Sequence, residues 1–212
     1  MLGAAATSGR GAHARGLPVQ KRDLVVIGAS AGGVEALSQL VAGLPAELPA
    51  ALLVVLHTPP TRDSRLPAIL CRAGVLPAAH ARDGERIRPG RIYVAPPKYH
   101  LTVDSESLRL IQGPTEKGFR PAADPLFRTA AQAYGARVVG VVLSGALDDG
   151  AAGLVAIKQR GGVTVAQDPD EALVASMPRS AIRFEHVDYV LPAAAVAALL
   201  VRLAGSSGIE GS

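Results

Sequence analysis

Short aliphatic runs without a polar residue constrain the fold of this chain most strongly. Residues 24–27, Leu-Val-Val-Ile, form the first run, and Gly28 ends it. A strand that is apolar on both faces is typical of a parallel sheet covered by helices on both sides. Because such runs alternate with helical patterns, the sequence predicts an α/β fold: a doubly wound, mostly parallel sheet in a three-layer αβα arrangement.

The pattern assigns each element to a stretch of residues. Strands are expected at residues 24–27, 51–56, 91–94, 101–103, 108–111, 137–143, 163–166 and 187–191. Helices are expected at residues 33–44, 63–71, 124–134, 149–160, 178–184 and 192–204. The helix at 124–134 is predicted to have Asp124 as its N-cap, with Pro125 at its first helical position.

The middle of the chain has a different character. Between residues 77 and 112, short strands and turns replace the alternation of strands and helices, and proline-containing pairs at 89–90 and 96–97 separate them. We expect an antiparallel hairpin excursion here, which includes the strands at 91–94, 101–103 and 108–111.

The net charge of +4 comes from one end of the chain. Residues 1–22 hold four basic side chains and no acidic one, whereas the remaining residues hold 18 of each. We therefore expect a disordered basic tail at 1–22, one α/β domain at 23–204 and a flexible tail at 205–212.

Composition argues against several classes of function. The domain has no basic surplus for phosphate backbones, and aromatic residues make up only 3% of the chain, so no nucleic-acid partner is expected. No apolar run approaches the roughly 20 residues of a membrane span, so no membrane insertion is expected. The single cysteine, Cys71, indicates a reducing compartment and favours a cytoplasmic protein.

Gly28, Ser30 and Gly32 form a G-x-S-x-G motif directly after a predicted strand and before a predicted helix. In this context the serine lies on a tight turn at the carboxyl edge of the sheet, where it can act as a nucleophile. The helix N-terminus behind it offers free N–H groups to a developing oxyanion, so the backbone at Ala31 and Gly32 belongs to the predicted site.

A nucleotide-phosphate loop is the alternative interpretation of the same glycines. A dinucleotide motif, however, needs glycine at position 30, where this chain has Ser30. It also needs an acidic residue after the second strand, where His57 stands. The residues favour the nucleophile.

Two histidines are candidates for the base. His57 follows the strand at 51–56 immediately, so it leaves the sheet at the same edge as Ser30. His100 begins a strand in the irregular middle section, where the pattern does not fix the direction of its side chain. The other histidines, His13, His80 and His186, stand at less suggestive places.

Asp148 and Asp149 follow the strand at 137–143 and lie at this same edge. A Ser–His pair requires a third group that orients the imidazole and stabilises its charged form. Adjacent acids before a helix are also typical of helix capping, and the residues alone leave the choice between Asp148 and Asp149 open. The order Ser, His, Asp differs from the Ser, Asp, His order of the α/β-hydrolases.

Across residues 23–203 the sequence resembles the catalytic domain of the chemotaxis receptor methylesterases, the CheB-type family. The matching stretches are 26–33 (VIGASAGG), 55–57 (VLH), 91–97 (RIYVAPP), 120–127 (RPAADPLF), 140–145 (GVVLSG), 149–153 (DGAAG), 166–168 (AQD) and 177–178 (MP). So many matches in the same order make the resemblance specific.

The resemblance implies Ser30 as nucleophile, His57 as base and Asp149, rather than Asp148, as the third member. It implies a protein-glutamate methylesterase, which removes methyl esters from γ-glutamyl side chains on the cytoplasmic helices of methylated chemoreceptors and releases methanol. Deamidation of receptor glutamines would follow the same acyl-enzyme route. No metal and no organic cofactor are implied.

Some features depart from the usual family pattern. The backbone near Ala146 is a third candidate for holding the oxyanion, and Ala146 stands where the family often has a methionine near that site. Thr58 and Arg62 replace a methionine and an aromatic residue after the histidine. Many relatives carry a receiver domain before the esterase, but only 22 residues precede Asp23, so we expect a stand-alone esterase. The alternative is a weakly active receptor-docking or regulatory module of the same fold.

Overall fold

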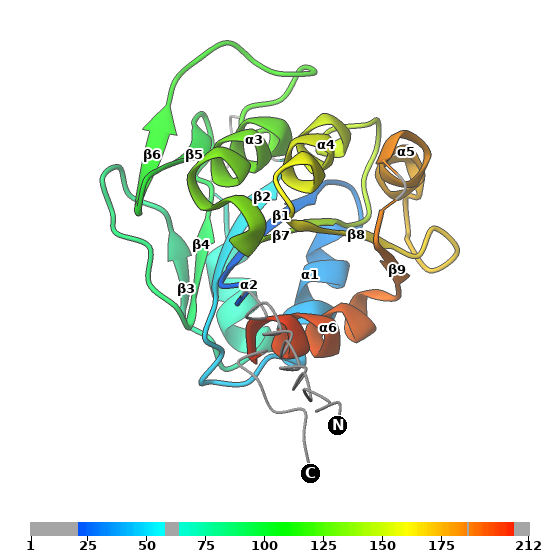
Figure 1. The fold of residues 1–212 in the computed structure, drawn as a ribbon, viewed down its shortest axis with the longest axis horizontal. Coiled ribbons are helices and arrows are strands. Elements are labelled where there is room, and N and C mark those ends of the chain that lie inside the picture. The colour runs from blue at the N-terminus through cyan, green and yellow to red at the C-terminus, as the bar shows by residue number, and fades with distance from the viewer. Residues whose placement is uncertain (1–20, 58–63, 186, 206–212) are drawn as a thin grey trace, which may run out of the picture.

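The computed structural model describes residues 21–57, 64–185 and 187–205, and a seven-stranded sheet lies at its centre (Figure 1). Neighbouring strands all run parallel, in the order β3-β4-β2-β1-β7-β8-β9. The strands are β1 (Leu24–Ala29), β2 (Ala51–Leu56), β3 (Ala78–His80), β4 (Arg91–Val94), β7 (Val138–Val142), β8 (Val163–Gln167) and β9 (Tyr189–Leu191).

Helices cover both faces of this sheet, which confirms the predicted three-layer α/β fold (Figure 1). One face carries α1 (Gly33–Ala42), α2 (Leu66–Ala73) and α6 (Ala193–Gly205). The other face carries α3 (Ala123–Tyr134), α4 (Ala151–Gln159) and α5 (Ser176–Glu185). A short 3₁₀ turn at Gly135–Arg137 connects α3 to β7.

The central strand β1 supplies the cores on both faces. Val25 and Ile27 belong to the same apolar cluster as the inner side chains of α1 and α6, whereas Leu24 and Val26 belong to the cluster that contains α3. All six residues of β1 are buried, as its unbroken apolar run predicts for a strand covered on both sides.

The direction in which strands are added reverses at β1. After β1 the chain builds β2 on one side, with β4 and β3 further out, and later returns to build β7, β8 and β9 on the other side. In open α/β sheets, ligands bind outside the carboxyl ends of the strands at such a reversal. The segments that follow β1, β2 and β7 therefore meet where a site is expected.

A separate antiparallel hairpin packs beside α3. It consists of β5 (His100–Asp104) and β6 (Ser107–Ile111), and α3 holds it through a hydrogen bond from the Val103 N–H to Thr129 Oγ1 at 3.1 Å. The prediction of a hairpin excursion in the middle of the chain is thus confirmed for these two strands.

The expectation that residues 91–94 also belong to this excursion is wrong. β4 pairs in parallel with β2, with Arg91 opposite Ala51. Ile92 and Val94 fill one core and Tyr93 fills the other, each at most 1% exposed. This place inside the main sheet buries both faces of β4, and β3, which the sequence pattern did not indicate, extends the sheet beyond it.

Two expected helix starts also differ from the structure. α4 begins at Ala151, two residues after the expected Asp149, and α3 has Ala122 rather than Asp124 at its N-cap. Neither carboxylate caps its own helix, because each forms hydrogen bonds with a different element. Asp63, where the helix at 63–71 was expected to begin, lies outside the described residues.

The two ends of the described domain lie together. The Arg22 N–H donates to the Leu203 carbonyl at 3.3 Å, and the Arg22 guanidinium donates to the Gly161 carbonyl at 2.8 Å. Most of the two expected tails, residues 1–20 and 206–212, lies outside the described residues, so the domain bounds 23–204 remain a prediction. No helix in the described part of the chain is both long and apolar enough to span a membrane.

Candidate active site

Ser30 lies on the turn between β1 and α1, at the carboxyl edge of the sheet. Its N–H donates to the Ser144 carbonyl at 2.9 Å, and its own carbonyl accepts the Gly33 N–H at 2.9 Å. These two bonds fix the backbone on both sides of the side chain. Among the described residues, Ser30 Oγ makes no hydrogen bond, so the hydroxyl remains available to a substrate.

Ser144, which follows β7, supports this turn. Its Oγ donates to the Ala31 carbonyl at 2.7 Å and accepts the Val174 N–H at 2.9 Å. Gly32 is needed beside it, because φ is +75° there and a Cβ would lie 2.6 Å from Ser144 Oγ. The buried Ser144 therefore ties the turn after β1 to the loop after β7.

His57 directly follows β2, the strand that neighbours β1. Its N–H donates to the Ala29 carbonyl at 3.0 Å, which places it beside the Ser30 turn. Its Nε2 lies 2.7 Å from Asp149 Oδ2, and its side chain is only 3% exposed. The structure thus brings together the histidine and the aspartate that the sequence placed 92 residues apart.

Asp149 is held by the first turn of α3 as well as by His57. The N–H groups of Ala123 and Asp124 donate to its two carboxylate oxygens, at 2.6 and 3.1 Å. Burial alone would raise the pKa of Asp149, but the hydrogen bonds from His57 and from these N–H groups hold that pKa below its ordinary value. Asp149 is therefore an anion whose position is fixed.

Asp148 lies in a different environment. Its side chain is 48% exposed and forms an ion pair with Lys117 Nζ at 3.2 Å. Lys117 also lies 3.2 Å from the buried carboxylate of Asp124. The choice that the residues alone left open has a geometric answer: Asp149, not Asp148, contacts His57.

Ser30 and His57 line one cavity of about 710 Å³. His57 Nδ1 is buried and has no hydrogen-bond partner within the described part of the chain, and no hydrogen bond joins it to Ser30. Because Asp149 contacts Nε2, Nδ1 is the ring nitrogen that remains available to accept the Ser30 hydroxyl proton when a substrate binds. The other lining residues are Ala31, Gly32, Val34, Leu56, Lys98, Thr115, Gly118, Phe119 and Arg120.

The three backbone positions predicted for the oxyanion are not equivalent. Ala31 and Gly32 line the cavity beside Ser30, whereas Ala146 does not. The neighbouring Gly145 N–H is already bound to the Val174 carbonyl at 2.9 Å. Thr58 and Arg62, the two departures after the histidine, lie outside the described residues.

The rival base, His100, is a structural residue. It is 4% exposed, its Nε2 lies 2.8 Å from the Pro114 carbonyl, and its Nδ1 accepts the Ala122 N–H at 3.3 Å. Both ring nitrogens are therefore occupied, and His100 does not line the cavity. His80 binds the Ser64 carbonyl, while His13 and His186 lie outside the described residues.

Phe119 is a part of the site that sequence reasoning missed. Its ring stacks on the His57 imidazole, with centroids 3.7 Å apart and planes inclined by 11°. The only local signal is a lone aromatic residue in a polar stretch, and nothing in the spacing relates it to His57. Sequence reasoning also missed the bonds from Ser144 to Ala31 and from Lys117 to Asp148, because the two residues of each pair are distant in the sequence.

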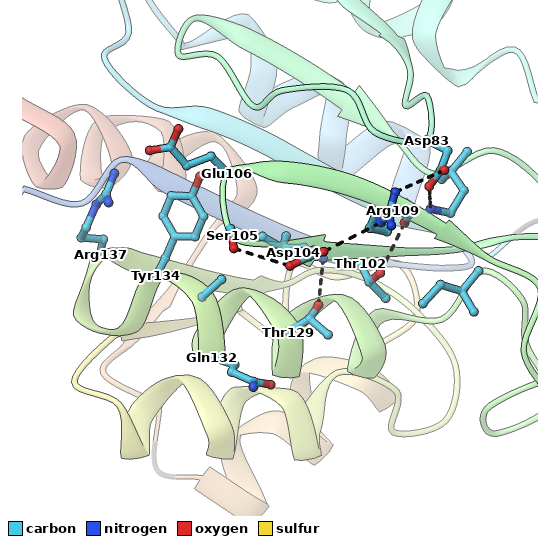
Figure 2. A pocket seen from close by; sticks show the side chains of 14 residues that line it. Asp83, Thr102, Asp104, Ser105, Glu106, Arg109, Thr129, Gln132, Tyr134 and Arg137 are labelled. Carbon is cyan, nitrogen blue, oxygen red and sulfur yellow. Dashed lines mark hydrogen bonds and ion pairs between the residues drawn. The ribbon is translucent and has the colours of Figure 1, made fainter.

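A larger cavity, of about 950 Å³, lies between the hairpin β5–β6 and α3 (Figure 2). It holds none of the three predicted catalytic residues. Its cations have partners, because Arg109 lies 3.6 Å from Asp83 and Arg137 binds Asp23 at 2.6 Å. Among the described residues there is also no cluster of three His, Cys, Asp or Glu side chains that would hold a metal ion.

Known proteins resemble this chain over most of its length. A relative from Methanosarcina acetivorans, named protein-glutamate methylesterase/protein-glutamine glutaminase 2, is 38% identical over 192 residues, which cover 87% of this chain and 54% of that protein. One from Symbiobacterium thermophilum, named protein-glutamate methylesterase/protein-glutamine glutaminase, is 40% identical over 185 residues, covering 87% and 51%. The chain thus spans about half the length of these two relatives.

Two further comparisons cover the matched protein almost completely. A relative from Leptospira interrogans is 39% identical over 182 residues, 85% of this chain and 94% of that protein. The crystal structure of the Thermotoga maritima CheB methylesterase catalytic domain matches with a TM-score of 0.82 and 34% identity, covering 87% of this chain and 100% of that one. The family profile of the CheB methylesterases matches residues 25–200. This chain belongs to the CheB methylesterase family.

Proposed function

We propose that this chain is a serine hydrolase that removes methyl esters from γ-glutamyl side chains of chemoreceptors, with release of methanol. The contact between His57 Nε2 and Asp149 at 2.7 Å, beside the Ser30 turn, carries this proposal. Membership of the family and the names of the relatives, which include protein-glutamate methylesterase and protein-glutamine glutaminase, support the same substrate class. Receptor glutamines would be deamidated by the same route.

The reaction begins when Ser30 Oγ attacks the ester carbonyl. His57 Nδ1 takes the hydroxyl proton, while Asp149 holds the Nε2–H and stabilises the imidazolium that forms. The backbone N–H groups of Ala31 and Gly32, which line the cavity beside Ser30, are the donors proposed for the oxyanion. Among the described residues neither N–H has another acceptor.

The intermediate then collapses to an acyl-enzyme. The bond to the methoxy group breaks, and methanol leaves with the proton from Nδ1. Water next attacks the acyl carbonyl, gives its proton to the same nitrogen, and Ser30 leaves with that proton as the free glutamate forms. With a glutamine substrate the leaving group is ammonia, and the remaining steps are identical.

The proposed partner is a helical receptor segment that presents the ester to the open cavity. Lys98 and Arg120 line this cavity, and none of its described lining residues is acidic. That balance suits a segment that carries glutamate side chains, the product of the reaction. A receptor domain of this kind lies in the cytoplasm, which is where we infer that the protein acts.

The test is methanol release from a peptide that carries a γ-glutamyl methyl ester. Ser30→Ala is expected to lower the rate by about 10⁴- to 10⁶-fold. Ser38→Ala is the matched control, because its hydroxyl binds the Val34 carbonyl within α1 and does not line the cavity. More than a tenth of the activity in Ser30→Ala, or no turnover by the unaltered chain as a docking module predicts, would contradict the proposal.

A further inference from the structure

One hydrogen bond does not fix the plane of the His57 imidazole. Asp149 holds the ring at Nε2, whereas Nδ1 has no partner among the described residues. The ring can therefore still tilt about the axis of the hydrogen bond to Asp149. The ring of Phe119 lies 3.7 Å away and nearly parallel, at 11°. A flat surface against one face removes the tilt and thereby sets the direction in which Nδ1 points.

Phe119 belongs to a tight, hydrogen-bonded turn. Glu116 and Phe119 exchange two backbone hydrogen bonds, at 3.1 and 2.9 Å. The residues between them, Lys117 and Gly118, have φ values of +50° and +86°. Positive φ at both central positions is typical of the type I′ turn, the tightest connection of a two-residue hairpin. The aromatic ring is therefore mounted on a short, well-defined element.

Lys117 ties this turn to the segments that hold Asp149. Its Nζ donates to the Asp148 carbonyl at 2.9 Å and lies 3.2 Å from the carboxylates of both Asp148 and Asp124. Burial alone would lower the pKa of Lys117, but the two carboxylates raise it, so the ammonium is charged. The Asp124 N–H donates to Asp149 in turn.

Asp124 and Glu116 complete the connection. Asp124 Oδ1 accepts the Gly153 N–H at 2.7 Å, which joins the first turns of α3 and α4. Glu116 binds Arg128 of α3 at 2.6 Å. The turn is thus attached at two points to the same helix whose N-terminus orients the catalytic carboxylate.

We propose that the turn Glu116–Phe119 is a positioning element for the catalytic base: Phe119 sets the plane of the His57 ring, and Lys117 fixes the turn to the loop that carries Asp149. This rests on the proposed hydrolase function. Phe119 also lines the cavity, so a contact with substrate is the competing role. The two roles make opposite predictions for kcat and KM.

The first test compares Phe119→Leu, Phe119→Tyr and Phe184→Leu by methanol release and by the NMR resonances of the His57 ring protons. Phe184 is the matched control, since it is 60% exposed on α5. In Phe119→Leu we expect kcat to fall about 10- to 100-fold with KM within about threefold, and the His57 ring protons to shift downfield as the ring current is lost. Phe119→Tyr keeps an aromatic ring, so kcat and the His57 resonances are expected to stay close to those of the unaltered chain. Phe184→Leu is expected to change neither kcat nor these resonances.

The second test concerns Lys117. Lys117→Met is expected to lower kcat about tenfold, and the double variant with Phe119→Leu to be no slower than Phe119→Leu alone, because both changes release the same ring. Lys21→Met, at an exposed position near the start of the domain, is the control.

The outcomes that overturn the proposal are specific. A rise in KM at constant kcat in Phe119→Leu would make Phe119 a substrate contact, and unchanged kcat with unchanged His57 resonances would remove its role altogether. Fully additive losses in the double variant would refute the coupling through Lys117. If the unaltered chain releases no methanol in a Ser30-dependent manner, the proposed function fails, while the NMR comparison without substrate still decides whether Phe119 orients the ring.

Discussion

Asp148 and Asp149 are adjacent in the sequence, yet the structure puts their carboxylates to different uses. Asp149 is buried, accepts two backbone N–H groups and contacts His57, whereas Asp148 is half-exposed and pairs with Lys117. A charge that is buried and fully hydrogen-bonded acts on its neighbour with little screening, and an exposed one does not. The catalytic role is therefore expected to fall on Asp149 alone.

This difference can be measured on the reaction rate. Asp149→Asn is expected to lower kcat by about 10³- to 10⁴-fold, because an amide no longer selects the tautomer with a proton on the nitrogen that faces it. Asp148→Asn is expected to cost less than about tenfold, which corresponds to about 1.4 kcal/mol. Parallel assays of methanol release check this, and a reversed ranking of the two variants would show that the assignment is wrong.

The depressed pKa of Asp149 also links the residue to stability. Because the folded-state pKa lies below the unfolded value, the ionised carboxylate stabilises the fold above the unfolded value of about 3.9, and this contribution disappears as the pH falls through the folded pKa. Asp149→Asn is expected to be less stable by about 1–3 kcal/mol at pH 7, since an amide nitrogen would face a backbone N–H.

Urea unfolding at pH 7, 5, 4 and 3 tests this linkage. The stability difference between the unaltered chain and Asp149→Asn should be largest at neutral pH and should shrink below about pH 4. A difference that stays constant over this range would mean that the charge of Asp149 does not contribute.

Contacts between loops, rather than any single strand, build the edge of the candidate site. Two hydrogen bonds join the turn after β1 to the loop after β7: the Ser30 N–H donates to the Ser144 carbonyl, and Ser144 Oγ donates to the Ala31 carbonyl. Close approach of these loops is possible because position 32 has no side chain: a Cβ there would collide with Ser144 and with Leu173. The position of Ser30, the proposed nucleophile, thus depends on a contact between elements.

Gly32→Ala measures the strength of this requirement. Alanine must adopt φ near +75° and displace Ser144, so the free energy of unfolding is expected to fall by about 2–4 kcal/mol. Gly84→Ala is the matched control, because Gly84 has φ +73° but no atom within 4 Å of the point that a Cβ would occupy, so only the backbone cost of about 1–2 kcal/mol applies. Equal losses in urea unfolding would show that the approach to Ser144 is not tight.

At the scale of the whole molecule, the apolar runs of the sequence predict most of the sheet. The aliphatic runs predict β1, β2 and β7, because burial on both faces leaves no polar residue in them, and they predict β8, where Thr164 interrupts the run. β4 was assigned to the wrong sheet, since a four-residue run between turns has no feature that distinguishes parallel from antiparallel pairing. The local sequence pattern predicts that a strand forms, but it does not predict which strand pairs with it.

The candidate site likewise contains residues that the sequence predicts and residues that it does not. The sequence predicts Ser30 from a G-x-S-x-G motif that follows a predicted strand, and it predicts His57 from its place directly after another. Only the family resemblance separates Asp149 from Asp148. Phe119 was not found, because its partner His57 is far away in the sequence and stacking leaves no spacing to detect. What the sequence does not encode locally is the packing of irregular loops against each other.

The contacts of Arg22 and Asp23 indicate where the folded domain begins, and shortened chains can test this boundary. A chain of residues 21–205 is expected to unfold in one transition with a Tm within about 3 °C of the full chain, because Arg22 and Asp23 bind Leu203, Gly161 and Arg137. A chain of residues 24–205 loses these contacts, and its Tm should fall by a further 2–4 °C or about 1 kcal/mol. Equal Tm values for the two shortened chains, measured by calorimetry, would show that this junction contributes nothing.

The most direct measurement of the central claim is covalent labelling of the folded, full-length protein with a fluorophosphonate, followed by peptide mass spectrometry. A serine activated by His57 and Asp149 reacts with this probe, whereas an ordinary serine does not. We predict one adduct on Ser30, its absence in Ser30→Ala, and much slower labelling in Asp149→Asn. An unlabelled Ser30 in the active preparation, or an adduct on another serine instead, would contradict the claim that Ser30 is the nucleophile.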